Sequence, residues 1–270
     1  MKLSRTPGNL KQKDLRILLT NDDGIHAQGL EVLRQIAAEL SDDIWVVAPE
    51  TEQSGGSRSL TLADPLRVRH IDERTFAING TPTDCILVGV AKLIKGRQPD
   101  LVLSGVNRGQ NIADDVTYSG TVAGAMEGSC AGISSIALSQ AFSSRRSSEP
   151  CWQTARAFAP QIIARLLDVG WQKNIIINLN FPDEKPEDVK GVKLTPQSLR
   201  NKLPTHIDER IDARGNTYYW IGYANRDDPQ QDEGDIIALA QGYVTLTPLH
   251  LNLTAERALA DIMKKFTFCP

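Results

Sequence analysis

Short apolar runs alternate with segments of helical periodicity along the first two thirds of the chain. The runs have the length of strands, and their almost wholly apolar character is typical of strands that are covered on both faces. They are LRILLT at 15–20, IWVVA at 44–48, FAING at 76–80, PDLVLS at 99–104, SSIALS at 134–139 and NIIINLN at 174–180. This pattern predicts the strands of a buried, mainly parallel sheet.

The segments between these runs predict helices. Apolar residues recur at helical spacing after the first run, at Leu30, Leu33, Ala37 and Leu40. A helix start is expected at Thr81, which can cap, with Pro82 at the first helical position and Asp84 three residues after the cap. Further helices are expected at 120–130 and 154–167. Strands that alternate with helices predict an α/β fold with a doubly wound sheet.

The pattern changes after Pro182. Three stretches predict strands without intervening helices, split by the polar stretch 201–216: VKGVKLT at 189–195, NTYYWIGY at 216–223 and IIALAQGYVTLTPL at 236–249. They are interpreted as hairpins on an arm, followed by a closing helix at 254–266 capped by Thr254. The predicted organisation is a flexible tail at 1–13, a core at 14–184, and a C-terminal β arm and helix at 185–270 within the same domain.

Composition narrows the function classes. With 270 residues, 41% hydrophobic residues and a net charge of -3, the chain is expected to be soluble, and no apolar run approaches the about 18 residues of a membrane helix. The polar, basic start MKLSRTPGNLKQKD does not resemble a signal peptide. Lys and Arg are dispersed, which argues against a nucleic-acid polymer as partner but leaves a single phosphate possible. The cysteines are scattered and form no C-x-x-C pair, which favours reduced thiols in a cytoplasm over a zinc site or disulfides. They are Cys85, Cys130, Cys151 and Cys269.

Polar residues gather at the carboxyl ends of the predicted strands, where ligands bind in such sheets. They are NDD at 21–23, ETEQSGGS at 50–57 and SGVNRGQN at 104–111. Carboxylate, hydroxyl and amide oxygens are the donors that Mg²⁺ prefers and Mn²⁺ accepts. Asp22 and Asp23 are therefore candidate metal ligands, although Asn, Asp and Gly also make ordinary solvated turns.

A second candidate is the start of the helix at 120–130. Ser119, Gly120 and Thr121 place a hydroxyl and free backbone N–H groups at a helix N-terminus, which suits a phosphate. The alternative is a plain Ser/Thr cap on a tightly packed helix, since Gly120, Gly124 and Gly128 recur every four residues.

Six ordered blocks between Arg16 and Thr254 resemble the SurE family, the survival-protein nucleotidases. The blocks are TNDDGIHAQG, APETEQSGGSRSLT, NGTPTDC, PDLVLSGVNRGQN, DVTYSGTVAGAMEG and GYVTLTPLHLNLT. The resemblance implies a Rossmann-like core, a C-terminal arm used in oligomerisation as a dimer or tetramer, and a phosphomonoesterase that hydrolyses nucleoside 5′- and 3′-monophosphates with one Mg²⁺ or Mn²⁺ per subunit. The tail to Lys13 and the stretch 201–232 match no block.

The resemblance also implies roles for individual residues. The implied metal ligands are Asp22, Asp23, Ser54 and Asn107, and the implied phosphate ligands are Asn111, Ser119, Gly120 and Thr121. Asp22 and Asp23 are the expected catalytic residues, because one of them would orient or deprotonate the attacking water. Asp22 is the preferred candidate for this role. Direct attack by the Asp22 carboxylate is the alternative.

Other residues and other protein classes are weaker candidates. His26 could hydrogen-bond a substrate or act as an acid, and Arg58 and Arg108 could pair with a phosphate, but a surface role is the more common one for each. Glu127 could support the ligands of the site or form a plain salt bridge, and the acidic run 227–235 suits a solvated loop. Asn21 stands where a haloacid-dehalogenase-type phosphatase needs its nucleophilic Asp, and neither dinucleotide, P-loop nor G-x-S-x-G motifs occur. A non-catalytic sensor of nucleotide or phosphate on the same fold is the remaining alternative.

Overall fold

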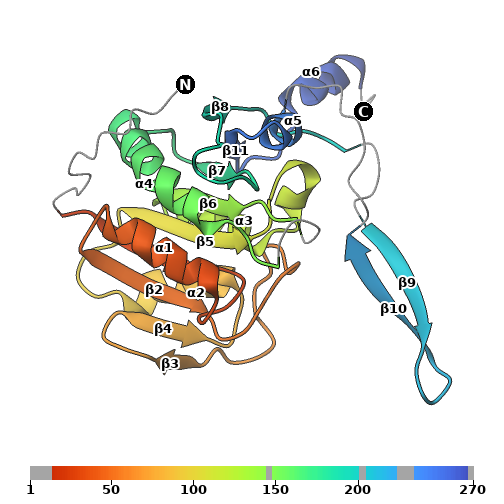
Figure 1. Ribbon diagram of the computed structural model, residues 1–270, viewed down its shortest axis with the longest axis horizontal. Helices are drawn as coiled ribbons and strands as arrows, with labels where there is room; N and C mark the ends of the chain where they lie inside the picture. Colours follow the sequence, from red (N-terminus) through yellow and green to blue (C-terminus); the bar gives the residue numbers. More distant parts are fainter. Residues whose placement is uncertain (1–13, 144–147, 201–204, 224–233, 267–270) are drawn as a thin grey trace.

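A nine-stranded sheet forms the centre of the molecule (Figure 1), with strand order β3-β4-β2-β1-β5-β6-β7-β11-β8. The computed structural model describes residues 14–143, 148–200, 205–223 and 234–266. Six neighbouring strands run parallel, as predicted: β4 (Thr75–Ile78), β2 (Asp43–Pro49), β1 (Arg16–Thr20), β5 (Leu101–Arg108), β6 (Ser134–Gln140) and β7 (Ile175–Phe181). The edges carry β3 (Val68–His70), antiparallel to β4, and β11 (Val244–His250), antiparallel to β7, with β8 (Val192–Leu194) beyond it.

Helices cover both faces of this sheet. α1 (Gln28–Ala38) and α4 (Trp152–Val169) pack on one face, in front in Figure 1, whereas α2 (Pro82–Val88) and α3 (Gly120–Cys130) pack on the other. Successive strand residues point to opposite faces. Ile17 and Leu19 of β1 accordingly lie in the core under α1 and α4, while Leu18 lies in the core under α2. The doubly wound α/β class predicted from the apolar runs is confirmed.

The predicted start of α2 is also confirmed. Thr81 accepts a hydrogen bond from the backbone of Asp84, the Asp84 carboxylate accepts one from the backbone of Thr81, and Pro82 takes the first helical position. A π-helical segment (Gly89–Leu93) continues this helix. The expected helix at 120–130 matches α3 residue for residue.

The stretch IIALAQGYVTLTPL was wrongly predicted as a single strand. It divides into α5 (Asp235–Ala240) and β11, separated by Gly242 in the left-handed conformation (φ +85°). Glycine reverses the chain there without a steric cost, which ends the helix. A helix of this length shows too few turns for a periodic pattern to identify it.

The arm is smaller than predicted. Within it, β9 (Thr205–Ile211) and β10 (Thr217–Tyr223) form a separate antiparallel pair that projects from the body in Figure 1, whereas β8 and β11 belong to the central sheet. The polar stretch 201–216 was expected to separate strands, but its residues 205–211 form β9, because pairing with the aromatic-rich β10 supplies the contacts that their composition does not suggest.

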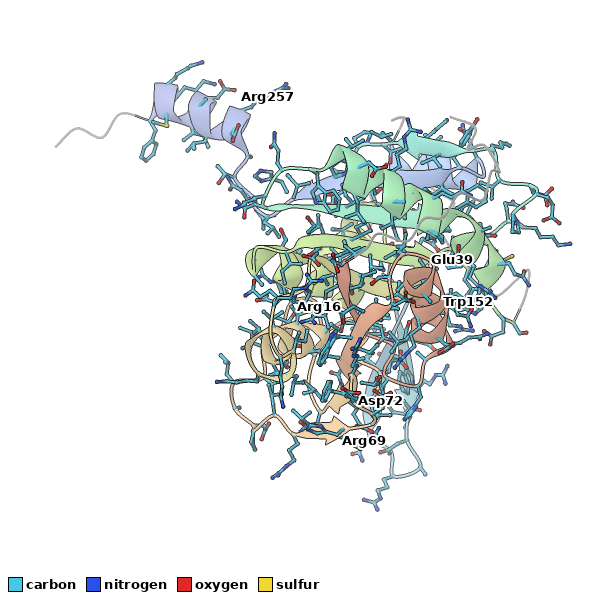
Figure 2. The ribbon with its side chains drawn as sticks, turned by 90° about the vertical axis from the view of Figure 1, so that its left-hand side faces the viewer. Arg16, Glu39, Arg69, Asp72, Trp152 and Arg257 are labelled. Atoms are coloured by element: carbon cyan, nitrogen blue, oxygen red, sulfur yellow. The ribbon has the colours of Figure 1, made fainter. Side chains whose placement is uncertain are left out.

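The closing helix differs from its prediction as well. α6 (Glu256–Lys265) starts after Ala255 without a side-chain cap, so Thr254 does not cap it, and none of its residues is buried. Figure 2 shows α6, marked by Arg257, standing away from the body. No helix within the described residues is long and apolar enough to cross a membrane. The predicted tail at 1–13, residues 227–233 of the acidic run, and Cys269 lie outside the described residues.

Candidate active site

The candidate site lies where the winding of the sheet reverses. β1 lies between β2 and β5, and the chain winds outward in opposite directions from β1 and β5. Ligands of doubly wound sheets bind beyond the carboxyl ends of the strands at this switch point. Thr20 and Ser104 are paired at the ends of these two strands, so the loops that follow them begin side by side.

The loops after β1 and β5 meet at Asp23. Its Oδ2 atom accepts a hydrogen bond of 3.3 Å from the backbone nitrogen of Arg108. β5 extends beyond its predicted end at Ser104, and its register shifts between Ser104 and Asn107. A side chain at Gly105 (φ +135°) would approach the Leu138 carbonyl oxygen to 2.2 Å, so glycine is required at this irregularity. The irregular strand end therefore brings the backbone of Arg108 to Asp23, with Asn107 next to it in the chain.

The loop after β2 joins the same site. The backbone nitrogen of Gln53 donates to the Asp22 carbonyl oxygen at 2.7 Å, which places Ser54 next to the aspartate turn. The exposed Ser54 hydroxyl donates to Glu52 at 2.9 Å. Glu52 was missed by the sequence analysis, although it stands within the polar loop 50–57, and its charge raises the pKa of both Asp22 and Asp23.

The N-terminus of α3 packs directly on Asp22. The Thr121 hydroxyl donates a hydrogen bond to Asp22 Oδ1, and Ser119 caps the helix by accepting from the backbone of Val122 at 3.0 Å. A Cβ atom on Gly120 would lie 2.7 Å from that of Asp22, so only glycine allows this approach. The alternative, tight packing of the helix, holds for Gly124 and Gly128. An added Cβ would meet side chains of β1 and β5 at Gly124, and of β5 and β6 at Gly128, all within 3 Å.

Burial dominates the electrostatics of the two carboxylates. Burial raises the pKa of Asp22, and hydrogen bonds from the side chain and backbone of Thr121 oppose this rise. Burial and the neighbouring charge of Asp22 raise the pKa of Asp23 to about 7. Two adjacent acids held in this way favour a positive partner, because charge in a poorly solvated place is costly unless it is neutralised.

The donor set at this place fits a hard cation. Asp22, Asp23, Ser54 and Asn107 offer carboxylate, hydroxyl and amide oxygens, which suit Mg²⁺ or Mn²⁺. The Asn107 amide nitrogen donates to the Gly109 carbonyl oxygen at 2.8 Å, so its oxygen is the atom that remains for a ligand. Within the described residues, no three His, Cys, Asp or Glu side chains form a cluster suited to a metal. A cation bound here would therefore depend on the two carboxylates together with the neutral oxygens of Ser54 and Asn107.

Asn111 lies on the β6 and β7 side of the site. Its amide nitrogen donates to Ser139 at 2.9 Å, its backbone nitrogen donates to Asn180 at 2.8 Å, and its carbonyl oxygen accepts from Asn178 at 2.7 Å. Asn178 and Asn180, which fix this residue, were missed by the sequence analysis. Two asparagines at alternating positions of a buried apolar strand were the available clue, because buried amides require partners.

The weaker candidates have other partners. Arg58 forms an ion pair with Glu127 (2.7 Å) and contacts Cys130 Sγ at 3.0 Å, which matches the salt bridge expected of Glu127. The Arg108 guanidinium lies over the Phe142 ring and donates to the Ser148 carbonyl oxygen. His26 is exposed, and its Nε2 atom lies 3.5 Å from the Nη2 atom of Arg69. Arg69, which is labelled in Figure 2, forms an ion pair with Glu50.

The fold and the site together define a doubly wound α/β protein with one buried and one half-buried carboxylate and a helix N-terminus at the switch point of its sheet. A family model described as Survival protein SurE matches residues 17–203. The chain belongs to the SurE family, as the six sequence blocks indicated.

Individual relatives are similar over most of their length. A protein from Caulobacter vibrioides named 5′-nucleotidase SurE is 56% identical over 241 residues, which cover 89% of this chain and 92% of the relative. A protein of the same name from Brucella canis is 54% identical over 250 residues, with 92% and 97% covered. The crystal structure of the SurE protein from Aquifex aeolicus superposes with a TM-score of 0.80 at 36% identity, covering 93% of this chain and 99% of that one.

Proposed function

We propose that this protein is a 5′-nucleotidase that hydrolyses nucleoside 5′-monophosphates, and also 3′-monophosphates, to nucleoside and phosphate. The observation that carries the proposal is the contact between Asp22 and the N-terminus of α3 at the sheet's switch point. It joins a two-carboxylate site to a helix N-terminus, where backbone N–H groups favour a phosphate. The 5′-nucleotidase names of relatives at 54% and 56% identity support the same activity.

A divalent cation would be held by Asp22, Asp23, Ser54 and Asn107, and when bound it supplies positive charge that polarises the phosphorus and neutralises phosphoryl oxygens. Ser119 and Gly120 provide a hydroxyl and a backbone N–H for the other phosphate oxygens. Asn111, held by hydrogen bonds to β6 and β7, is a further phosphate ligand in this proposal.

Asp22 is the residue best placed to act on the attacking water, because Thr121 holds its carboxylate in one orientation. In this scheme the carboxylate takes a proton as the water oxygen bonds to phosphorus. The ester P–O bond then breaks, and the ribose oxygen leaves as an alcohol after it takes up a proton from the protonated Asp22 or from solvent. Attack by the Asp22 carboxylate itself is the alternative route, and it would pass through an acyl phosphate.

We also infer a homo-oligomer in a reducing compartment such as the cytoplasm. The hairpin of β9 and β10 exposes large apolar side chains, including Ile207 and Ile221, and α6 exposes Leu259 and Ile262. Such surfaces are characteristic of protein interfaces. The three described cysteines are free, which is the state expected where disulfides do not persist.

The deciding experiment measures phosphate release from AMP, GMP, their 3′ isomers and p-nitrophenyl phosphate, with Mg²⁺ or Mn²⁺ and with EDTA. We expect release that EDTA abolishes, and we expect folded Asp22→Asn and Asp23→Asn variants to lose most activity, since Asn keeps the turn but not the charge. Turnover that persists in EDTA would refute the metal site. If no ester is hydrolysed but phosphate raises the melting temperature, the protein is a phosphate sensor instead.

A further inference from the structure

A single short segment connects the candidate phosphate ligands. Asn111 precedes the 3₁₀ helix Ala113–Thr117, and Ser119 follows it. Asp115 ties the two ends of this 3₁₀ helix together, because its backbone nitrogen donates to the Ile112 carbonyl oxygen and its carbonyl oxygen accepts from the Tyr118 nitrogen, at 3.1 and 3.0 Å. A shift of the 3₁₀ helix would therefore move the phosphate-binding turn that begins at Ser119.

The C-terminal part of the chain holds this 3₁₀ helix through a buried ion pair. The Arg200 guanidinium binds both Asp115 carboxylate oxygens, at 3.0 and 2.9 Å, with side-chain exposures of 9% and 7%. The Arg200 backbone nitrogen also donates to Asp114 at 2.9 Å. A bidentate pair of this kind fixes both the distance and the orientation of the carboxylate.

Two neighbouring contacts act on the same 3₁₀ helix. Ala113 has a positive φ of 51°, which a residue other than glycine rarely adopts and which persists only where its surroundings impose it. Asp235 accepts from the Ala113 nitrogen at 3.1 Å, and Gln197 donates to the Ala113 carbonyl oxygen at 2.9 Å. The second Asp235 oxygen accepts from the Ser198 nitrogen at 3.0 Å. The segment 197–200 and the start of α5 thus impose the conformation that leads into the site.

We propose that Arg200 is a positioning residue for phosphate binding, acting through Asp115 on the turn at Ser119–Thr121. The inference rests on the proposed function, which assigns the substrate phosphate to that turn. Buried ion pairs add little net stability, because desolvation offsets their attraction, whereas they can specify a single geometry. Geometry is what a phosphate site requires, since misplacement by about 1 Å costs up to about 10²-fold in rate.

Two variants test the proposal. Arg200→Lys keeps the charge but loses the two-pronged contact, and the double variant Arg200→Met with Asp115→Asn removes both charges without leaving a buried carboxylate unpaired. The matched control is Arg16→Met. Arg16, labelled in Figure 2, forms a part-buried ion pair with Asp43 at the opposite end of β1.

The measurements are kcat and KM for AMP, the Kd for inorganic phosphate by calorimetry, and the melting temperature. In the double variant we expect kcat/KM to fall by about 10-fold or more and phosphate binding to weaken in parallel, with Arg200→Lys intermediate. The control should lose melting temperature without a change in kcat/KM or phosphate Kd.

Wild-type values of kcat/KM and phosphate Kd in the double variant would overturn the inference, as would an equal loss in the control. If the double variant does not fold, the same readouts on Arg200→Lys decide. A wild-type protein that binds phosphate but hydrolyses no ester would refute the proposed function alone, and the phosphate Kd would still judge Arg200. A wild-type protein that neither binds nor hydrolyses refutes both.

Discussion

At the scale of single residues, Thr121 has a different partner from the one that its sequence position suggests. The resemblance assigns it to the substrate phosphate, yet in the structure its hydroxyl donates to Asp22. A hydroxyl has one hydrogen to donate, and Thr121 donates it to the Asp22 carboxylate. We therefore propose that Thr121 acts on the reaction through the orientation of Asp22.

Removal of this hydroxyl should affect turnover more than binding. We expect Thr121→Ala to lower kcat by about 10²-fold, the cost of a misplaced catalytic group, with a smaller rise in KM. Thr121→Ser keeps the hydroxyl and is the control, which should retain most of kcat. Steady-state kinetics with AMP measure both constants. An alanine variant that raises only KM would assign Thr121 to uniform binding of the substrate and not to the positioning of Asp22.

The residues that could be predicted from the sequence are those whose chemistry is local. Asp22 and Asp23 stand out because charge follows an apolar run, and Ser119 because it precedes a helix. Asn178 and Asn180 could be noticed but not paired, since their partner Asn111 is 67 and 69 residues away. Nothing in the local sequence specifies which buried amide meets which backbone group.

At the scale of elements, the core was predictable and the C-terminal part was not. The buried strands and α3 were found because short, almost wholly apolar runs and a capped helix have local causes. β9 carries mostly polar residues, and its strand conformation depends on its partner β10. α6 has the periodicity of an amphipathic helix, but its apolar residues are exposed. Periodicity indicates which face of a helix is apolar, and not what covers that face.

The docking of α3 on β1 is testable at Gly120. Alanine is the better helix former by about 0.5–1 kcal/mol, so Gly120→Ala would stabilise an isolated helix. Here the added Cβ would lie 2.7 Å from the Asp22 Cβ, closer than unbonded carbon atoms approach. We therefore expect lower stability and a loss of AMP hydrolysis of about 10-fold or more, because α3 must shift away from Asp22.

Gly89→Ala is the matched control for this substitution. Gly89 is also helical, but the three atoms nearest to its added Cβ all belong to the Val47 side chain, the closest at 3.2 Å, in the core under α2. Activity should persist in this control. Full activity in Gly120→Ala would mean that the contact between α3 and Asp22 is not needed for hydrolysis. Thermal melts and kcat/KM together separate a loss of fold from a loss of the site.

At the scale of the whole molecule, many of the exposed large apolar residues lie on two projecting elements, the hairpin of β9 and β10 and the helix α6. One face of the hairpin carries Ile207, Ile211, Tyr219 and Ile221, all more than half exposed, and Ile207 and Ile221 are direct cross-strand partners. The hairpin and α6 both extend away from the sheet in Figure 1. An isolated two-stranded hairpin is marginally stable in water, so a hairpin of this kind needs a second surface.

We expect this second surface to be another copy of the chain, so that the protein is at least a dimer at micromolar concentration. Ile207→Thr with Ile221→Thr keeps the preference for a strand but removes apolar area from one face, and it should shift the mass measured by light scattering toward the monomer. Arg210→Thr, on the opposite face, is the control and should assemble like the wild type. Deletion of residues 254–270 should also weaken assembly, since it removes the exposed apolar face of α6. A monomeric wild-type protein would refute the oligomer, and unchanged assembly of the double threonine variant would exclude this hairpin face as its interface.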